Sequence, residues 1–289
     1  MGVSIDAFTQ RLVQDEQVQS VLVLQHPNRW YQSDSIDLLY LIIDNGAVAK
    51  HDVQNLIFED KSILAYRISQ WQLETCAMQG STDERILLLL LHAEIVSDKF
   101  NYARKYRERL QKGTHKVMKC RICEEYSGFL QHYMEAKELL LRQLTLDAYQ
   151  AVIHALQRWA RLVIYEAGEL PELSLWTQVK QKDPAVYKLY EELTTSTEPL
   201  EKRVELMLLP IEVNVLAKLK GATQCIVDIM QTENRPWFLH EMIQHPELSK
   251  RNLDLQLLME KMAKRSMLYE VAVLQENGQA MEKGYLLSL

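Results

Sequence analysis

Two aspartates in a short polar segment have the clearest potential for chemistry. The segment Ser33-Asp34-Ser35-Ile36-Asp37 leads into an apolar run that predicts a strand. Carboxylates are ligands that Mg²⁺ prefers. Because side chains alternate along a strand, Asp34 and Asp37 should point to opposite faces unless a bulge re-aims Asp34. The alternatives are that Ser33 and Asp34 only shape a turn, and that Asp37 is a solvated residue at the strand end.

A second group of polar residues lies in a predicted helix in the middle of the chain. His154 and Arg158 are one helical turn apart, beside Trp159 and Arg161. This basic edge could line a cleft between the first two predicted domains. The alternative is a helix face that packs on its neighbours.

Two of the four cysteines form a Cys-x-x-Cys pair, Cys120 and Cys123. A structural zinc site needs four ligands, usually from two such pairs, and the sequence has no second pair. Two cysteines three residues apart on a helix are more often half-buried apolar groups. We therefore predict free thiols rather than a zinc site.

The elements that must position these residues fall into three predicted domains. Residues 1–112 alternate between strands and helices, as in an α+β domain. The strands are predicted over 18–24, 36–43, 48–58, 63–68 and 94–96, and the helices over 4–16, 71–78, 83–91 and 100–111.

Residues 113–232 read as an all-α helical bundle, and residues 233–289 read as a C-terminal winged helix-turn-helix. Gly168 is placed to end a bundle helix. The bundle helices are predicted over 115–144, 146–167, 173–182, 184–193, 200–219 and 222–230. The tail is predicted to have helices over 236–244 and 253–265 and strands over 268–273 and 280–287, joined by an Asn277-Gly278 turn.

The strand–loop–strand frame of residues 18–43 resembles the polymerase-β-type nucleotidyltransferases. Those enzymes place Gly-Ser after the first strand and Asp-x-Asp at the start of the second, and with a third acid they hold two Mg²⁺ ions. The resemblance aligns Asp37 with the second aspartate, whereas Ser35 stands at the first. It implies a relic metal site at Asp37, with Asp34 a weaker candidate.

The same resemblance assigns a possible nucleotide site. Gln25 and His26 stand where the family has Gly-Ser, and together with Arg29 and Ser35 they are the candidate nucleotide-binding residues. In related aminoglycoside nucleotidyltransferases the helical domain helps to hold the acceptor. By that resemblance, His154 and Arg158 are candidates for an acceptor cleft.

Nearly the whole chain is similar to a small bacterial family of nucleotidyltransferase-like proteins. These join a nucleotidyltransferase-like domain, a helical middle and a C-terminal helix-turn-helix. The similarity lies in the segments 154–162, 176–179, 186–193 and 200–206. It specifies the fold better than the activity, because fold does not determine function.

The predicted winged helix could contact DNA through basic residues. The candidates are Lys250, Arg251, Lys261, Lys264 and Arg265. However, residues 235–289 contain seven basic and seven acidic residues, so their formal charge is zero. A DNA-reading module is usually clearly positive, so contact with a protein is at least as good an interpretation. Trp237, Phe238 and Met267, if exposed, favour a homodimer.

The bulk properties describe an ordinary globular chain. Its 289 residues suffice for two or three modules, and the formal net charge of −6 argues against a protein that mainly coats nucleic acid. The longest apolar run, residues 86–91, is far shorter than the ~20 residues of a membrane span. No secretory leader pattern is visible, so we expect a cytoplasmic protein with no membrane contact.

Three functions remain open from the sequence. The first is a nucleotidyltransferase-like pseudoenzyme with a degenerate site, impaired in transfer, which either binds a nucleotide or another anion in the relic cleft or acts as a scaffold. The second is an active Mg²⁺-dependent transferase with a remodelled site, which uses Asp34, Asp37 and an acid such as Asp52 or Glu59. The third is a regulatory protein that binds DNA or protein through its winged helix.

Overall fold

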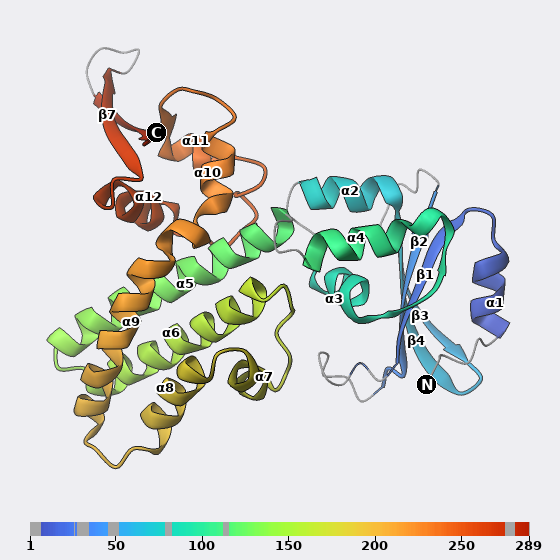
Figure 1. Cartoon of the computed structure of the whole chain (residues 1–289), viewed down its shortest axis with the longest axis horizontal. Helices are drawn as coiled ribbons and strands as arrows, with labels where there is room; N and C mark the ends of the chain where they lie inside the picture. The colour runs from blue at the N-terminus through green and yellow to red at the C-terminus, as the bar shows by residue number, and fades with distance from the viewer. Residues whose placement is uncertain are drawn as a thin grey trace. The chain divides into compact units, whose positions relative to one another are not determined.

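The chain forms two compact units in the computed structural model, which describes residues 7–25, 27, 35–45, 52–78, 83–111, 116–274 and 281–288. The first unit contains Met1–Met118 and Ala167–Leu175, and the second contains Lys119–Glu166 and Trp176–Leu289. The helical bundle and the C-terminal segment, residues 233–289, thus belong to the same unit (Figure 1). The division into three domains at residues 112 and 232 stays a prediction.

A mixed sheet forms the centre of the first unit. In the described residues it has five strands in the order β3-β4-β2-β1-β5. Only β2 and β4 are parallel, and the other neighbouring pairs within the described part are antiparallel. The strands are β1 (Val18–Gln25), β2 (Leu38–Asp44), β3 (Asp52–Phe58), β4 (Lys61–Ser69) and β5 (Glu94–Asp98).

The central strands are apolar on both faces because helices cover both faces of the sheet (Figure 1). On one face, α1 (Ala7–Gln14) packs its Phe8 against the core cluster that includes Tyr40, and the hydroxyl groups of Thr9 and Tyr40 are 2.8 Å apart. The opposite face is covered by helices that follow β4 in the chain. These are α2 (Gln70–Met78), α3 (Glu84–His92) and α4 (Tyr102–Gln111).

The predicted strands of this unit coincide with the observed ones to within a few residues. The helix predicted over 100–111 begins later, at Tyr102, because Phe100 and Asn101 have φ values of +61° and +57°. These two residues belong to the short 3₁₀ turn η2 (Lys99–Asn101). Left-handed backbone of this kind cannot continue into the first turn of an α-helix.

The second unit is built on helices. Two long ones, α5 (Lys116–Leu141) and α6 (Thr145–Glu166), form a hairpin through the short connection 142–144, so they run antiparallel. Gly168 follows α6 with φ +73°, which confirms the predicted stop. The remaining helices of the bundle are α7 (Leu175–Lys182), α8 (Pro184–Thr195), α9 (Leu200–Ala222) and α10 (Gln224–Met230).

The C-terminal segment combines helices with a small sheet. In the described residues three strands have the order β6-β8-β7. The elements are β6 (Trp237–Phe238), α11 (Leu239–Gln244), α12 (Leu255–Lys264), β7 (Leu268–Leu274) and β8 (Met281–Leu287). The predicted Asn277-Gly278 turn lies outside the described residues.

Two expectations for this segment were wrong. The helix predicted over 236–244 starts only at Leu239, because Trp237 and Phe238 pair with β8 as a strand. Trp237 is also not exposed: its side chain is buried, and its indole Nε1 donates to the carbonyl oxygen of Met230 at 3.2 Å. It therefore contributes to the core of its own chain, and the homodimer stays a prediction.

The C-terminal segment is pinned to α5 by polar contacts. The backbone N–H of Asp254 donates to Ser127 Oγ at 2.9 Å, and Arg251 forms an ion pair with Glu124 at 3.5 Å. These contacts explain physically why bundle and tail form one compact unit. Across the described ranges, no helix combines the length and the apolar character needed to cross a membrane.

Candidate functional site

Asp37 lies just before β2, with its carboxylate engaged by the neighbouring strand. Its Oδ2 accepts a hydrogen bond from the backbone N–H of Ser62 at 2.8 Å, and its own N–H donates to Ser62 O at 2.9 Å. This pair of bonds sets the start of the parallel β2–β4 register, in which Leu38 is opposite Ile63. The described contacts of Asp37 are thus those of a strand-pairing residue.

Two of the candidate nucleotide-binding residues are described. Gln25 ends β1 opposite Leu38 and is exposed, and Ser35 is an exposed residue two positions before Asp37. His26, Arg29 and Asp34 lie outside the described residues. Whether Gln25, His26, Arg29 and Ser35 share a nucleotide site stays a prediction, as does the weaker assignment of Asp34 to a metal site.

The described residues near Asp37 do not fit a two-metal site. No group of three or more His, Cys, Asp or Glu side chains in the described ranges is arranged to hold a metal ion. In the β3–β4 register Asp52 lies opposite Arg67, near the far end of β4. Asp37 contacts Ser62, five residues earlier on β4, so at ~3.3 Å per strand residue the two aspartates are about 16 Å apart along the strand. Glu59 is an exposed residue of the β3–β4 turn. We therefore derive no catalytic step through Mg²⁺.

A buried carboxylate at the other end of β2 is neutralised by an arginine. Asp44 Oδ2 accepts from Arg67 Nε at 2.6 Å, and Oδ1 accepts from Arg67 NH2 at 3.2 Å. The hydrogen bond to Asp44 is the main reason why the pKa of Arg67 is raised. This bidentate pair ties β2 to β4.

The candidate acceptor residues, in contrast, line a hollow in the α5–α6 hairpin. It has a volume of about 450 Å³, within the ordinary range of about 300–1,000 Å³ for small-molecule sites. Its lining residues are His132 from α5 and His154, Gln157, Arg158 and Arg161 from α6. We name it the hairpin hollow. All of its lining residues lie in the second unit.

A partly buried ion pair positions Arg158 in this hollow. Arg158 NH1 lies 3.1 Å from Oε2 of Glu125, whose side chain is only 9% exposed. Burial raises the pKa of Glu125, and the positive charges of Arg158 and Arg161 act in the opposite direction. The guanidinium therefore has a fixed partner on α5, and the Arg158 side chain also lines the hollow.

The Arg158 side chain lies close against the backbone of α5 at Gly128. A Cβ atom at this position would be 2.9 Å from Arg158 Nε and 3.1 Å from its Cδ. A side chain here would have to push the arginine away from Glu125. The glycine lies on the same face of α5 as Glu125 and His132, at spacings of three and four residues.

The two histidines face each other across the hairpin. Their ring centroids are 5.0 Å apart. His132 Nδ1 is 3.1 Å from a carboxylate oxygen of Glu135, and Gln150 Nε2 donates to His154 Nε2 at 2.8 Å. Arg161 is exposed at the rim. Guanidinium, imidazole and amide side chains thus line one hollow, and such groups can donate hydrogen bonds to an anion.

Sequence reasoning found part of this site and missed the rest. It singled out His154 and Arg158 but not Glu125, Gly128 or His132. A signal was present: His132 and His154 are equally distant from Gln143, in the centre of the short connection. In an antiparallel helical hairpin such residues face each other.

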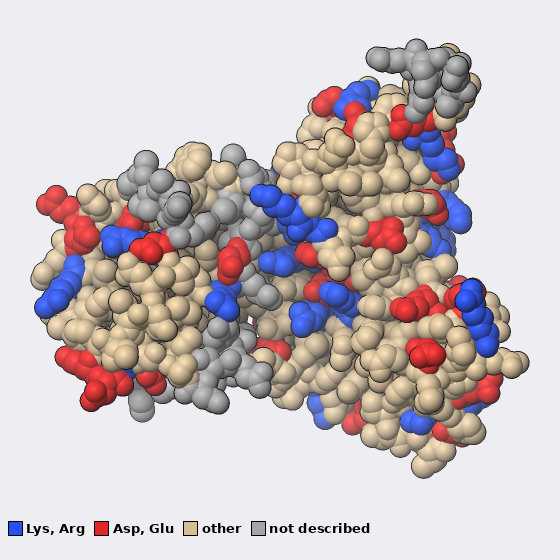
Figure 2. Space-filling view, turned by 180° about the vertical axis from the view of Figure 1, so that it is seen from behind, with Lys and Arg blue, Asp and Glu red and all other residues tan. Residues whose placement is uncertain are grey.

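The candidate DNA-contacting residues do not form one exposed basic surface in the described residues. The side chain of Arg251 is only 6% exposed and is held by Glu124, whereas Lys250 is exposed. Lys261, Lys264 and Arg265 line a second hollow, described below. On the face shown in Figure 2, basic and acidic side chains are interspersed over the C-terminal segment at the upper right. Contact with DNA stays a prediction.

Among the described residues, Cys120, Cys123 and Cys225 belong to no group of three or more side chains that could hold a metal ion. Cys120 and Cys123 are both buried in α5, and the Sγ atoms of Cys120 and Cys225 are 2.6 Å apart. Burial raises the pKa of the Cys123 thiol. The sequence spacing thus drew attention to Cys123, but the spatial neighbour of Cys120 is a cysteine 105 residues away, in α10.

The fold and its two regions agree with known protein families. Residues 1–116 match the family model described as Nucleotidyltransferase-like, and residues 119–218 match that described as YgxA-like substrate binding domain. The chain therefore combines a nucleotidyltransferase-like fold with a helical region similar to that binding domain. The hairpin hollow lies entirely within residues 119–218.

Similar individual proteins extend over almost the whole chain. The chain is 28% identical over 268 residues to "Uncharacterized protein YgxA" of Bacillus subtilis (strain 168), covering 92% of this chain and 90% of that protein. A solved structure of a nucleotidyltransferase-like protein from Exiguobacterium sibiricum 255-15 has a TM-score of 0.72 and 21% identity. It covers 98% of this chain and 97% of its own, and it supports the fold alone.

Proposed function

We propose that this protein binds a phosphate-bearing anion, such as a nucleotide, in the hairpin hollow and is impaired in nucleotidyl transfer. The observation that carries the proposal is the convergence of Arg158, Arg161, His132 and His154 on one hollow. Arginine is well suited to phosphate because its planar guanidinium donates two parallel hydrogen bonds. Glu125 cancels part of the positive charge but fixes the arginine in place.

The proposed impairment rests on the surroundings of Asp37. A two-metal transferase holds its ions with several carboxylates on neighbouring strands. Here β4 carries no acidic residue between Lys61 and Ser69, and Asp37 accepts a backbone hydrogen bond from it. The protein is thus a nucleotidyltransferase-like pseudoenzyme in this proposal. A remodelled active site would need Asp34 to supply a further ligand.

Calorimetric titration with ATP and with pyrophosphate, each with and without Mg²⁺, tests the binding. The variant Arg161→Gln should weaken binding about tenfold, since one charge-assisted hydrogen bond is worth about 1.5 kcal/mol. Arg142→Gln is the matched control, because Arg142 is an exposed arginine of the α5–α6 connection that does not line the hollow. Equal effects of the two variants, or no binding by the wild type, would overturn the assignment.

A second measurement tests the impairment. The wild type and Asp37→Ala are incubated with labelled nucleoside triphosphates, Mg²⁺ or Mn²⁺ and candidate acceptors. We expect no transfer above the background of the variant. Robust transfer that Asp37→Ala abolishes would overturn the pseudoenzyme interpretation and favour the remodelled transferase.

We also propose that the C-terminal segment is a winged helix. Its support is the element order β6, α11, α12, β7, β8, with β6 paired to β8, which suits that architecture. Three of the cations that would suit DNA, Lys261, Lys264 and Arg265, line a hollow with the bundle instead. This placement favours contact with a ligand or a protein over contact with DNA. We therefore expect the protein to show negligible binding to duplex DNA, even at low salt.

A further inference from the structure

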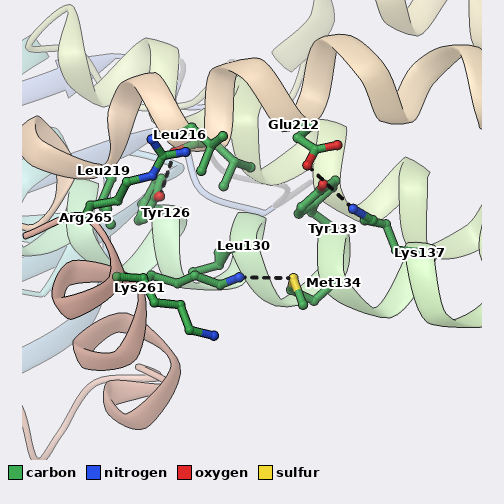
Figure 3. A pocket seen from close by; sticks show the side chains of 12 residues that line it. Tyr126, Leu130, Tyr133, Met134, Lys137, Glu212, Leu216, Leu219, Lys261 and Arg265 are labelled. Carbon is green, nitrogen blue, oxygen red and sulfur yellow. Dashed lines mark hydrogen bonds and ion pairs between the residues drawn. The ribbon is translucent and has the colours of Figure 1, made fainter.

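A second hollow lies where α12 meets α5 and α9, all within the second unit (Figure 3). Its volume is about 290 Å³, close to the lower end of the range of about 300–1,000 Å³ for small-molecule sites. We name it the α12 hollow. It shares no lining residue with the hairpin hollow.

Most of the wall is apolar. Leu130 and Met134 contribute from α5, and Val215, Leu216 and Leu219 contribute from α9. Met134 and Leu216 are 38% and 39% exposed, so part of this apolar wall is open to solvent. An apolar ligand body would remove this surface from water and gain about 25 cal/mol per Å² that it covers.

The residues that line the hollow carry more positive than negative charges. Lys137, Lys261, Lys264 and Arg265 are among the lining residues, and Glu212 is the one carboxylate in that set. Glu212 already forms an ion pair with Lys137 at 3.5 Å. The three cations at the end of α12 therefore have no counter-ion within the lining, so an anion there would meet an excess of positive charge.

Lys261 shows how these cations are placed. Its ammonium group points over the apolar wall and donates to Met134 Sδ at 3.6 Å, a weak acceptor (Figure 3). Burial lowers the pKa of Lys261, and the nearby charges of Lys264 and Lys137 lower it further. A carboxylate or phosphate group at this point would replace a poor acceptor with a strong one and would relieve the repulsion.

We propose that the α12 hollow binds a small amphipathic anion, with an apolar body against α5 and α9 and an anionic head beside Lys261 and Lys264. The ligand would contact α12 and the bundle helices together. Its binding would therefore stabilise the second unit against unfolding. This site is independent of the anion site proposed in the hairpin hollow.

Displacement of the fluorescent probe anilinonaphthalene sulfonate, an aromatic anion of the required character, tests the proposal. Decanoate and decyl phosphate distinguish the two possible head groups, and either one should displace the probe. Decanol lacks the charge and acetate lacks the body, so neither should displace it at the same concentration. Pyrophosphate should not displace it either, which separates this site from the hairpin hollow. Equal displacement by decanol and by both anions would overturn the proposal.

Variants locate the binding. Lys261→Met keeps a long apolar side chain but removes the charge, and we expect it to weaken anion binding about tenfold. Leu216→Glu adds a repelling carboxylate to the wall and should abolish binding. Lys250→Met is the matched control, because Lys250 is an exposed lysine outside the hollow. With far-ultraviolet circular dichroism showing each variant folded, equal affinities for Lys261→Met and Lys250→Met would refute the assignment.

Discussion

The ion pair between Glu125 and Arg158 makes a prediction that depends on pH. Replacing Arg158 by methionine keeps most of the apolar length of the side chain but leaves Glu125, only 9% exposed, without its counter-ion. Breaking a fully buried pair in this way costs about 3–5 kcal/mol. Because the Arg158 side chain is 35% exposed, solvent screens the pair, and we expect a smaller loss of about 2 kcal/mol at pH 7.

The loss should shrink as the pH falls. Burial raises the pKa of Glu125 in the folded wild type, while Arg158 opposes that rise. Removing Arg158 therefore raises the folded pKa further above the ordinary value of about 4.3. A folded state that binds the proton more tightly than the unfolded state loses stability as pH rises through this window. At pH below it Glu125 is protonated and needs no counter-ion, so wild type and variant should converge.

Urea unfolding followed by circular dichroism at pH 5 and pH 8 measures the difference. The double variant Glu125→Gln with Arg158→Met should recover much of the lost stability at pH 8 and lose the pH dependence. An Arg158→Met variant with equal losses at both pH values would refute the reasoning. So would a double variant that is no more stable at pH 8 than the single one.

Three further predictions concern other parts of the fold. Asp37→Ala should destabilise the first unit by about 1 kcal/mol through the lost bond to Ser62, whereas Asp37→Asn, which keeps an acceptor oxygen, should cost less in the same urea assay. Gly168→Ala should cost about 1–3 kcal/mol, because φ is +73° and the added Cβ would be 2.7 Å from Gln111 O; a thermal melt measures the loss. Alkylation of Cys123 by iodoacetamide at pH 8 should be slow in the folded protein and fast in urea, because burial raises the pKa of this thiol; mass spectrometry of its peptide gives both rates.

The strands of the first unit could be predicted because their signal is local. Residues 21–24 and 38–43 are continuous apolar runs, and such runs indicate strands buried on both faces. The sheet order was not predicted, since the pairing of β1 with β5 joins residues more than 70 positions apart. The same limit explains the error at Trp237 and Phe238, whose strand character comes from β8.

The candidate site shows a similar division between local and long-range information. The one-turn spacing of His154 and Arg158 could be recognised within a single helix. Their partners Glu125 and His132 lie on another helix, and only the antiparallel hairpin brings them close. Likewise, Asp37 could be aligned with a metal ligand by its position in the sequence. Its hydrogen bond to Ser62 depends on the parallel pairing of β2 with β4, which are neighbours in the sheet but are separated in the sequence by β3.

The first unit is made of two separate segments of the chain, and this has a consequence for the design of truncated fragments. The segment Ala167–Leu175 belongs to that unit, although Lys119–Glu166, which is nearly the whole α5–α6 hairpin, lies between it and Met118. Leu170 in this segment is 2% exposed, and Gly168 lies against Gln111. A fragment that stops at residue 118 would lose part of its own interior, and a fragment of residues 119–289 would carry a stretch that belongs to its neighbour. Neither unit corresponds to one uninterrupted stretch of the gene, so joining residues 1–118 to 167–175 through a short linker is the more suitable design for an isolated first unit.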